Sequence, residues 1–500
     1  MNNNRSSGVL LPIFSLPGDY GCGNFGKAAF DFVDLLKDCG FHYWQVLPFT
    51  NTDACNSPYK SDSAFAGNLN FIDPEGLFTL GLVTEEELAA QKFGPEWKVS
   101  YDLLKENRPD FLKTAFGRCD AAMMRKIRAF AKKNAWLVEY ALYMTIRETE
   151  GCDWMEWKDP ALRDHLPEAV EAAKKKYKKQ MEFYYFVQYI FFTQWQKVKD
   201  YANENEVYII GDMPIYVSFE SCDVWSQREM FDLDEKGYPQ NVAGVPPDYF
   251  SPTGQKWGNP LYNWKAMRED GYTWWKERLM HTFKMVDKVR IDHFRAFSAY
   301  WAVPAEDEDA MGGKWIPGEG MKFLNEMYKH VDKESIIAED LGVQDEELTA
   351  LLKDSGLPGM RVMQFGFLSS EDDMHLPHNY PHNMIAYTGT HDNKPLLAYL
   401  WELSPKQREY CLSYCGFVGE DWQNGGSYNP AIRAMIETLW KTQAKLVVSP
   451  IQDLCGFGGD TTMNCPGTNE GNWMFRMTSE NMAAVNKEYL KKINHLYKRA

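Results

Sequence analysis

One unit recurs along the chain, a helix followed by a short apolar strand, and it restricts the fold more than any other feature. Residues 28–39 carry apolar side chains at helical spacing, Gly40 fits the end of that helix, and residues 41–47 follow as a strand. The same pair is expected again at residues 186–201 and 207–210, 274–283 and 286–291, 321–330 and 335–338, 346–353 and 360–365, and 432–443 and 444–449. Residues 8–14 add a strand near the N-terminus. So many alternating units predict an α/β fold, a closed (β/α)8 TIM barrel of parallel strands, rather than an all-β or all-α protein.

The chain is much longer than such a barrel requires. It has 500 residues, whereas a bare barrel takes about 250. We therefore expect residues 1–500 to form one catalytic barrel that carries large insertions. Residues 76–180 are rich in charged helix formers and predict a helical insertion subdomain, with an amphipathic run over 121–148. Residues 218–264, with closely spaced prolines from 231 onward, predict a loop-rich insertion, and long loops in compact enzymes are usually lids or binding loops.

Charge and composition exclude several partners. The chain has 54 basic and 70 acidic side chains, a net charge of -16, which repels phosphate backbones and anionic membrane surfaces. Its longest apolar stretch, residues 183–192, includes Gln188 and falls short of the ~20 residues that span a bilayer. The ten cysteines show neither CxxC pairs nor a histidine-rich neighbourhood, which is typical of thiols in a reducing compartment. We expect a cytoplasmic protein that binds neither nucleic acid nor membranes.

The strand expected at residues 286–291 ends in charged side chains. Because side chains alternate along a strand, Arg290 and Asp292 share one face, while Val289 and Ile291 share the other. If the apolar pair packs against the outer helices, the charged pair points into the barrel, which is tolerable at the carboxyl rim, where barrel enzymes keep their chemistry. Beside a permanent cation, Asp292 would stay ionised, as a carboxylate nucleophile must. A purely structural ion pair is the alternative.

Two more expected strands end in acidic groups. Residues 336–340 (IIAED) and 387–392 (YTGTHD) supply Glu339 and Asp392, and the intervening lengths allow both to reach the same rim as Asp292. Alternation does not choose between Glu339 and the adjacent Asp340, since it says only that the two face opposite ways.

Converging carboxylates serve two chemistries. They can bind Mg²⁺ through oxygen ligands, or they can act on a glycosidic bond, one attacking while another donates a proton. Arg290 opposes a divalent metal beside Asp292. The 15% content of aromatic residues favours sugar, because pyranose C–H faces pack well on aromatic rings. A GxGxxG pattern at Gly21 does not indicate a nucleotide, because no strand precedes it.

Seven segments, in order along nearly the whole chain, carry a resemblance to a known family. Residues 289–295 (VRIDHFR), 338–342 (AEDLG) and 387–393 (YTGTHDN) closely resemble the three catalytic segments of the 4-alpha-glucanotransferases. These are the amylomaltases or disproportionating enzymes of glycoside hydrolase family 77, relatives of the alpha-amylases. Further matches are residues 57–68 (SPYKSDSAFAGN), 211–217 (GDMPIYV), 244–260 (GVPPDYFSPTGQKWGNP) and 464–476 (NCPGTNEGNWMFR). Each is modest evidence alone, and together they are highly specific.

The resemblance implies a retaining double displacement. Asp292 would be the nucleophile, Glu339 the general acid and base, and Asp392 the carboxylate that holds sugar hydroxyls and favours ring distortion. The donor would be a maltodextrin or another starch-like α-1,4-glucan, and the acceptor glucose or a maltodextrin; no cofactor and no metal ion are implied. Two rivals remain: an α-1,4-glucan hydrolase of the alpha-amylase type, and a non-catalytic glucan-binding protein.

The resemblance also implies substrate contacts. It places Arg290, His293 and His391 around the cleaved sugar, with Tyr59 as its stacking platform, and it assigns contacts with neighbouring glucosyl units to Asp212, Asp248, Gln255, Trp257 and Asn464. Without it, the aromatic residues could equally be core side chains and Asn464 a turn cap. Residues 244–258 match the family's lid, which would limit water entry.

The sequence departs from the family pattern at two places. Thr462 stands where Arg is expected, and Lys394-Pro395 follows THDN where an acidic or small residue and Thr are usual. These departures put the outer subsites in doubt.

Overall fold

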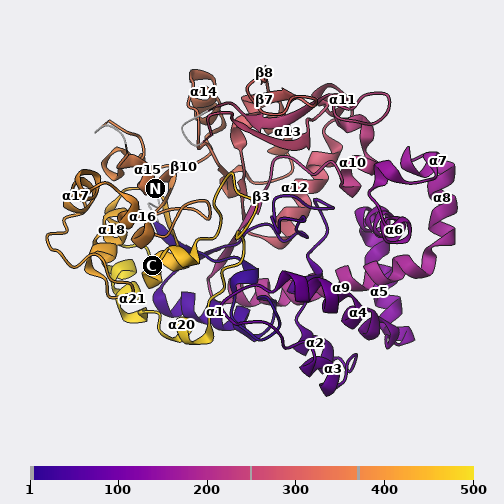
Figure 1. The fold of residues 1–500 in the computed structure, drawn as a ribbon, viewed down its shortest axis with the longest axis horizontal. Helices are drawn as coiled ribbons and strands as arrows, with labels where there is room; N and C mark the ends of the chain where they lie inside the picture. Colours follow the sequence, from indigo (N-terminus) through magenta and orange to yellow (C-terminus); the bar gives the residue numbers. More distant parts are fainter. Residues whose placement is uncertain (1–4, 248–250, 369–371) are drawn as a thin grey trace.

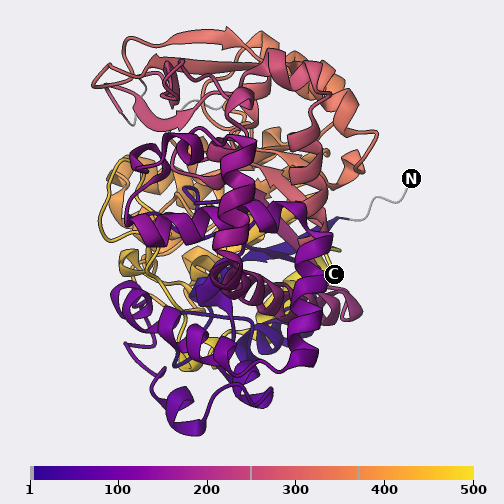
Figure 2. The ribbon, with the colours of Figure 1, turned by 90° about the vertical axis from the view of Figure 1, so that its right-hand side faces the viewer.

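A barrel of parallel strands forms the centre of the computed structural model, which describes residues 5–247, 251–368 and 372–500 (Figures 1 and 2). The eight strands lie in the order β10-β11-β12-β1-β2-β3-β6-β9. Their bounds are β1 Ser6–Leu10, β2 Tyr43–Gln45, β3 Tyr208–Met213, β6 Lys288–Ile291, β9 Ile336–Ala338, β10 Gly359–Val362, β11 Met384–Tyr387 and β12 Leu446–Pro450. A 2.9 Å hydrogen bond from the Ala338 amide to the Pro358 carbonyl brings β9 to the start of β10, so the sheet nearly closes. The predicted barrel is confirmed.

Alternation along the strands divides the barrel's side chains between two cores. The inner core consists of Leu10, Ile210, Ile337, Met360, Val362, Ile385, Tyr387, Leu446 and Val448. Residues at the alternate positions, Val289 and Ile291 among them, pack into the larger core shared with the surrounding helices. The predicted outward direction of these two side chains is therefore confirmed, and Arg290 and Asp292 take the opposite face.

Helices cover the outside of the barrel. The longer ones are α1 Lys27–Cys39, α9 Lys178–Glu204, α12 Thr273–Met285, α13 Gly320–Met327, α14 Glu346–Ser355, α16 Leu396–Glu402, α17 Pro405–Tyr414, α18 Pro430–Lys441 and α21 Lys487–Leu496. Short helices are α10 Cys222–Ser226, α11 Trp264–Glu269, α15 Met363–Gly366, α19 Ile451–Cys455 and α20 Ser479–Ala483. As expected, Gly40 ends α1, in the left-handed conformation with φ 75°. In the part of the chain that the structure describes, no helix is long and apolar enough to cross a membrane.

Two predicted strands are partly wrong. The strand expected over residues 8–14 ends at Leu10 as β1, and a short 3₁₀ helix follows at Ile13–Ser15. Residues 360–365 were expected to be a strand throughout, but β10 ends at Val362 and α15 begins at Met363. A short apolar run of this kind has no periodicity that separates a buried strand from a buried helix.

Additional helices gather on one side of the barrel, at the right in Figure 1. They are α2 Pro74–Thr79, α3 Glu85–Ala89, α4 Tyr101–Gly117, α5 Ala121–Lys133, α6 Ala135–Glu150, α7 Pro160–Arg163 and α8 Pro167–Lys176, and α4, α5, α6 and α8 pack against α9. The amphipathic run over 121–148 is two helices, which meet at Asn134. The description of residues 76–180 as a separate subdomain stays a prediction.

A second, antiparallel sheet lies above the barrel in Figures 1 and 2. Its strands are β4 Asn241–Val245, β5 Gln255–Pro260, β7 Ala299–Pro304 and β8 Lys314–Pro317, in the order β5-β4-β7-β8. Within residues 218–264, where a loop-rich insertion was expected, β4 and β5 are regular strands rather than loops. The prolines mark the limits of these strands rather than their absence, since Pro246 and Pro252 lie between them and Pro260 ends β5.

Trp195 of α9 provides a test of the larger core, which the barrel shares with the surrounding helices. Its fully buried indole donates a 2.9 Å hydrogen bond to the Met285 carbonyl, and its ring centroid lies 4.5 Å from that of Phe49. We expect Trp195→Ala to lower the free energy of unfolding by about 3–5 kcal/mol, because it leaves a cavity and an unpaired carbonyl. The measurement is urea unfolding followed by circular dichroism. Trp97→Ala, at a 61% exposed side chain, is the control and should change the free energy by less than about 0.5 kcal/mol; equal losses would contradict the expectation.

Candidate active site

The predicted acidic residues lie at one rim, where the carboxyl ends of parallel strands meet. Asp212 is the penultimate residue of β3, Asp292 directly follows β6, and Glu339 directly follows β9. The backbone ladder continues to these residues, since the amide of Asp292 donates to the Met213 carbonyl at 3.0 Å and that of Glu339 to the Ile291 carbonyl at 3.1 Å. Asp392 lies in the turn after β11.

Arg290 joins two of these carboxylates. Its Nε donates to Asp212 Oδ1 at 2.9 Å and its Nη2 to Asp292 Oδ1 at 2.6 Å. The side chains of Arg290 and Asp212 are 3% and 0% exposed, whereas that of Asp292 remains 29% exposed. The guanidinium therefore satisfies a buried carboxylate through Nε and fixes an accessible one through Nη2.

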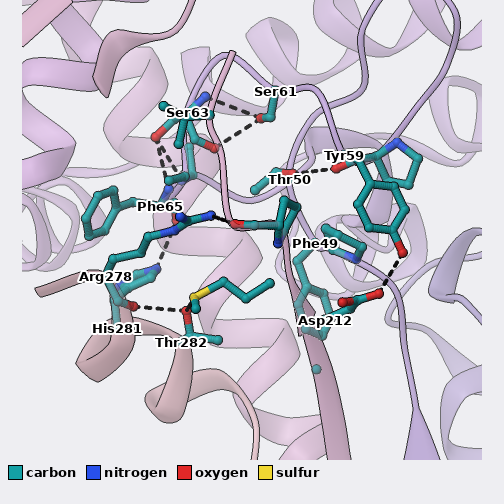
Figure 3. Close-up of a pocket in the computed structure, with 18 of the residues that line it drawn as sticks. Phe49, Thr50, Tyr59, Ser61, Ser63, Phe65, Asp212, Arg278, His281 and Thr282 are labelled. Atoms are coloured by element: carbon teal, nitrogen blue, oxygen red, sulfur yellow. Dashed lines mark hydrogen bonds between the residues drawn. The ribbon is translucent and has the colours of Figure 1, made fainter. Parts of the chain in front are cut away.

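Tyr59 continues the network from Asp212 to the turn after β11. Its hydroxyl donates to Asp212 Oδ2 at 2.6 Å (Figure 3) and lies 2.8 Å from Nε2 of His391. The two rings stack with centroids 5.3 Å apart. Nε2 of His391 lies 3.3 Å from Asp392 Oδ2, and the Asn464 amide donates to Asp392 Oδ1 at 2.6 Å. Residues from five separate segments thus form one contact network.

The structure separates Glu339 from Asp340. Glu339 accepts hydrogen bonds of 2.7 Å from the backbone amides of His293 and Leu341, which hold its carboxyl group beside the segment that follows Asp292. Asp340 turns the other way and pairs with buried Arg361 at 3.2 Å. Glu339 therefore belongs to the rim network, while Asp340 anchors β9 to β10.

The three carboxyl groups have different pKa values. Burial raises the pKa of Asp292 to about 6, and the Arg290 guanidinium limits the rise. Burial and the adjacent negative charge of Asp292 raise the pKa of Glu339 to about 8. Burial acts in the same direction on Asp392, but His391 and the Asn464 amide outweigh it and hold its pKa at about 2. At neutral pH, Asp292 and Asp392 are mainly ionised and Glu339 is mainly protonated.

The remaining predicted contacts lie on the side of the antiparallel sheet. Trp257 meets His293 edge to face, with ring centroids 4.9 Å apart, and its Nε1 donates to Gln255 Oε1 at 3.2 Å. Burial lowers the pKa of His293 to about 4, so that this ring is neutral. Its backbone is left-handed, with φ 50°, an uncommon conformation that turns the chain sharply after Asp292. Asp248 lies outside the described residues.

Comparisons with known proteins show to which family the chain belongs. The sequence profile of the 4-alpha-glucanotransferase family, glycoside hydrolase family 77, matches residues 11–482. The chain belongs to this family. It is 40% identical to the 4-alpha-glucanotransferase of Aquifex aeolicus, covering 99% of both chains. It is 38% identical to the chloroplastic/amyloplastic 4-alpha-glucanotransferase of Solanum tuberosum, covering 96% of this chain and 83% of that protein.

A solved structure of the family superimposes on the fold. The amylomaltase from Streptococcus agalactiae in complex with acarbose has a TM-score of 0.95 and 37% identity, over 99% of this chain and 100% of that one.

Trp473 is a site residue that the sequence reasoning did not single out. Its ring centroid lies 5.7 Å from that of Tyr59 and 5.8 Å from that of His391, and its backbone is left-handed with φ 63°. The signal was present, because Trp473 falls within the family-like segment 464–476. Asp453, which together with Thr388 of segment 387–393 holds the turn after β11, carried no comparable signal.

A pocket adjoins the site behind Tyr59 and Asp212 (Figure 3). Its walls are residues 48–67, the end of β3 with the segment that follows, and α12. Arg278 of α12 donates to the carbonyls of Pro214 and Ile215, so it fixes the chain just beyond Asp212. The pocket is therefore lined by residues that support the rim, and Asp292, Glu339 and Asp392 are not among its lining residues.

Arg290 allows a direct test of the network. We expect Arg290→Lys to lower the free energy of unfolding by about 1–3 kcal/mol, because an ammonium group keeps the charge but lacks the rigid planar donors with which the guanidinium reaches both carboxylates. Urea unfolding measures the change. The control is Arg268→Lys in the pair with Glu319, where the arginine is 50% exposed; there the loss should be below about 1 kcal/mol. If the two variants lost equal stability, the proposed importance of the Arg290 fork would be contradicted.

Proposed function

We propose that the chain transfers segments of an α-1,4-glucan from a maltodextrin or starch-like donor to glucose or another maltodextrin. Family membership supports the activity, and one observation of the site carries the chemistry: an ionised Asp292, fixed by Arg290, stands beside a Glu339 whose raised pKa keeps it protonated. One group is ready to attack and the other to donate a proton, which is what a retaining glycosidase-type reaction requires.

In the first half of the proposed reaction, Asp292 attacks the anomeric carbon while Glu339 protonates the departing glycosidic oxygen. The product is a glucosyl ester of Asp292, and the reducing-end fragment of the donor leaves. The two backbone amides that bind Glu339 hold its carboxyl group in place during this proton transfer.

In the second half, Glu339 has become a base and removes a proton from the acceptor hydroxyl, which then displaces Asp292. Two inversions return the original anomer, and we expect the two carboxyl groups to stand about 5 to 5.5 Å apart, the separation typical of retaining enzymes. A sugar acceptor gives transfer, whereas water gives hydrolysis. The hydrolase alternative uses the same residues but is not favoured by the family.

The other rim residues would bind the sugar. Asp392, ionised and held by His391 and Asn464, would accept hydrogen bonds from sugar hydroxyls and favour a distorted ring. Tyr59 would present its ring to the cleaved sugar, and Trp257 would stack on a neighbouring unit. Residues 244–258 are proposed to cover the cleft and limit water entry, and Asp248 and Gln255 are proposed to contact neighbouring glucosyl units.

We also place the reaction in the cytoplasm, on the basis of the cysteine content. Nucleic acid and membrane surfaces are not proposed as partners, because the chain carries a net charge of -16. No cofactor takes part in the proposed steps.

Incubation with maltotriose alone tests the proposed transfer. We expect glucose to accumulate together with maltodextrins longer than the substrate, as separated by size, because each transfer shortens one chain and lengthens another. Asp292→Asn should lower kcat by at least about 10⁴-fold, since the nucleophile is lost, and should still bind maltotriose. Loss of glycosidic bonds without longer products would indicate a hydrolase instead, and full activity of Asp292→Asn would remove Asp292 from the mechanism.

The pH dependence of kcat/KM should be bell-shaped. Activity falls below pH about 6, where Asp292 takes up a proton, and above pH about 8, where Glu339 loses its proton. Initial rates of glucose release from maltotriose, measured in overlapping buffers from pH about 5 to about 9, would show both limbs. Asp392, with a pKa of about 2, should not contribute in this range. A profile without the acid limb would contradict an ionised Asp292 as the nucleophile.

A further inference from the structure

The turn after β11 needs a fixed place on the rim, because it carries both His391 and Asp392. Its shape is set internally: the Thr390 amide donates to Asn393 Oδ1 at 2.8 Å, and the Asp392 amide donates to Thr390 Oγ1 at 3.2 Å. These bonds close the turn on itself. They do not determine where the turn sits relative to Asp292 and Glu339.

Asp453 of α19 binds both ends of this turn. Its Oδ2 accepts from Thr388 Oγ1 at 2.6 Å, where β11 ends, and its Oδ1 accepts from the Leu396 amide at 2.7 Å, where α16 begins. Asp453 is 1% exposed, and Thr388 and Leu396 are fully buried. The Thr388 hydroxyl also lies 2.9 Å from that of Ser449 in β12. One carboxyl group thus fastens the entrance and the exit of the turn to the neighbouring β12-α19 segment.

We propose that Asp453 is a positioning residue for glycosyl transfer, which acts by holding the His391-Asp392 turn at its reactive place on the rim. The inference rests on the proposed function. Its physical basis is that a displacement of about 1 Å in a substrate-orienting group can lower a rate by about 10²-fold. Asp453 acts through the turn and does not itself participate in bond cleavage.

The two hydrogen bonds of Asp453, to Thr388 and Leu396, form a clamp on the turn. This clamp depends on the shape of the Asp453 side chain more than on its charge. Burial raises the pKa of Asp453 to about 7, so both protonation states occur near neutrality. The ionised group accepts from both Thr388 and Leu396. The protonated group can donate to Thr388 Oγ1, which then donates to Ser449, while its other oxygen still accepts from Leu396. An asparagine can make the same two contacts, with its amide nitrogen as the donor to Thr388.

The experiment compares Asp453→Ala with Asp453→Asn by kcat and KM on maltotriose, at a temperature where circular dichroism shows both variants folded. We expect Asp453→Ala to lose about 100-fold in kcat with KM changed less than about threefold, because the orientation of Asp392 serves the transition state. Asp453→Asn should stay within about tenfold of the wild-type kcat.

The matched control is Asp287→Ala, at the opposite end of β6 from Asp292. Asp287 accepts from the Ile209 amide at 2.7 Å and from the Asn203 amide group at 2.9 Å, so its loss also removes a backbone and a side-chain contact. We expect this variant to melt at a lower temperature with kcat unchanged. A purely structural role of Asp453 would give the same pattern in Asp453→Ala.

Two results overturn the proposal: a folded Asp453→Ala with kcat near that of the wild type, or an Asp453→Asn as impaired as Asp453→Ala. If Asp453→Ala does not fold, Thr388→Val removes one arm of the clamp and should lower kcat about 3- to 10-fold, with Thr388→Ser restoring it; wild-type kcat in Thr388→Val would then overturn the proposal. Failure of the proposed function is distinct, because the wild type itself would not disproportionate maltotriose.

Discussion

The site depends on the fork that Arg290 forms between Asp212 and Asp292. An arginine inside a barrel is costly to desolvate, and it is stable here because the fully buried Asp212 carboxylate neutralises it. Lysine would be a poor replacement, since its ammonium lacks the rigid planar donors with which the guanidinium fixes both carboxylates. With Asp212 bound at Nε, the Nη2 group holds Asp292, the accessible carboxylate, in a fixed direction. The same Asp212 accepts from Tyr59 and so connects this fork to His391 and Asp392.

The difference in pKa between Asp292 and Glu339 follows from the position of the Arg290 guanidinium. Both groups are buried enough for desolvation to raise their pKa values. Asp292 contacts Arg290 directly, whereas Glu339 is bound by neutral backbone amides and faces the negative charge of Asp292. Two carboxyl groups in one cleft therefore carry different charges at the same pH. This arrangement is the general way in which an acid and a nucleophile coexist in one site.

The parts of the fold that depend on the alternation of side chains along strands could be predicted from the sequence. The alternation of Val289, Arg290, Ile291 and Asp292 predicted both the barrel-facing pair and the outward pair. It could not choose between Glu339 and Asp340, because that choice depends on Arg361, which binds Asp340 from the next strand. It likewise could not find the role of Asp453, which is set by contacts with segments far from it in the chain. The strands β4 and β5 were missed because prolines at strand limits resemble prolines in loops.

The two departures from the family pattern sit where the structure can tolerate them. Lys394 pairs with Glu402, and its carbonyl accepts from the Gln364 side chain at 2.9 Å, so the backbone of this position is held whatever side chain it bears. Thr462 bonds back to the Gly459 carbonyl at 2.7 Å, two residues before Asn464. Neither side chain enters the contacts that join Asp392 to His391 and Asn464. Variation at these positions therefore leaves in place the His391 and Asn464 side chains that contact the carboxylate of Asp392.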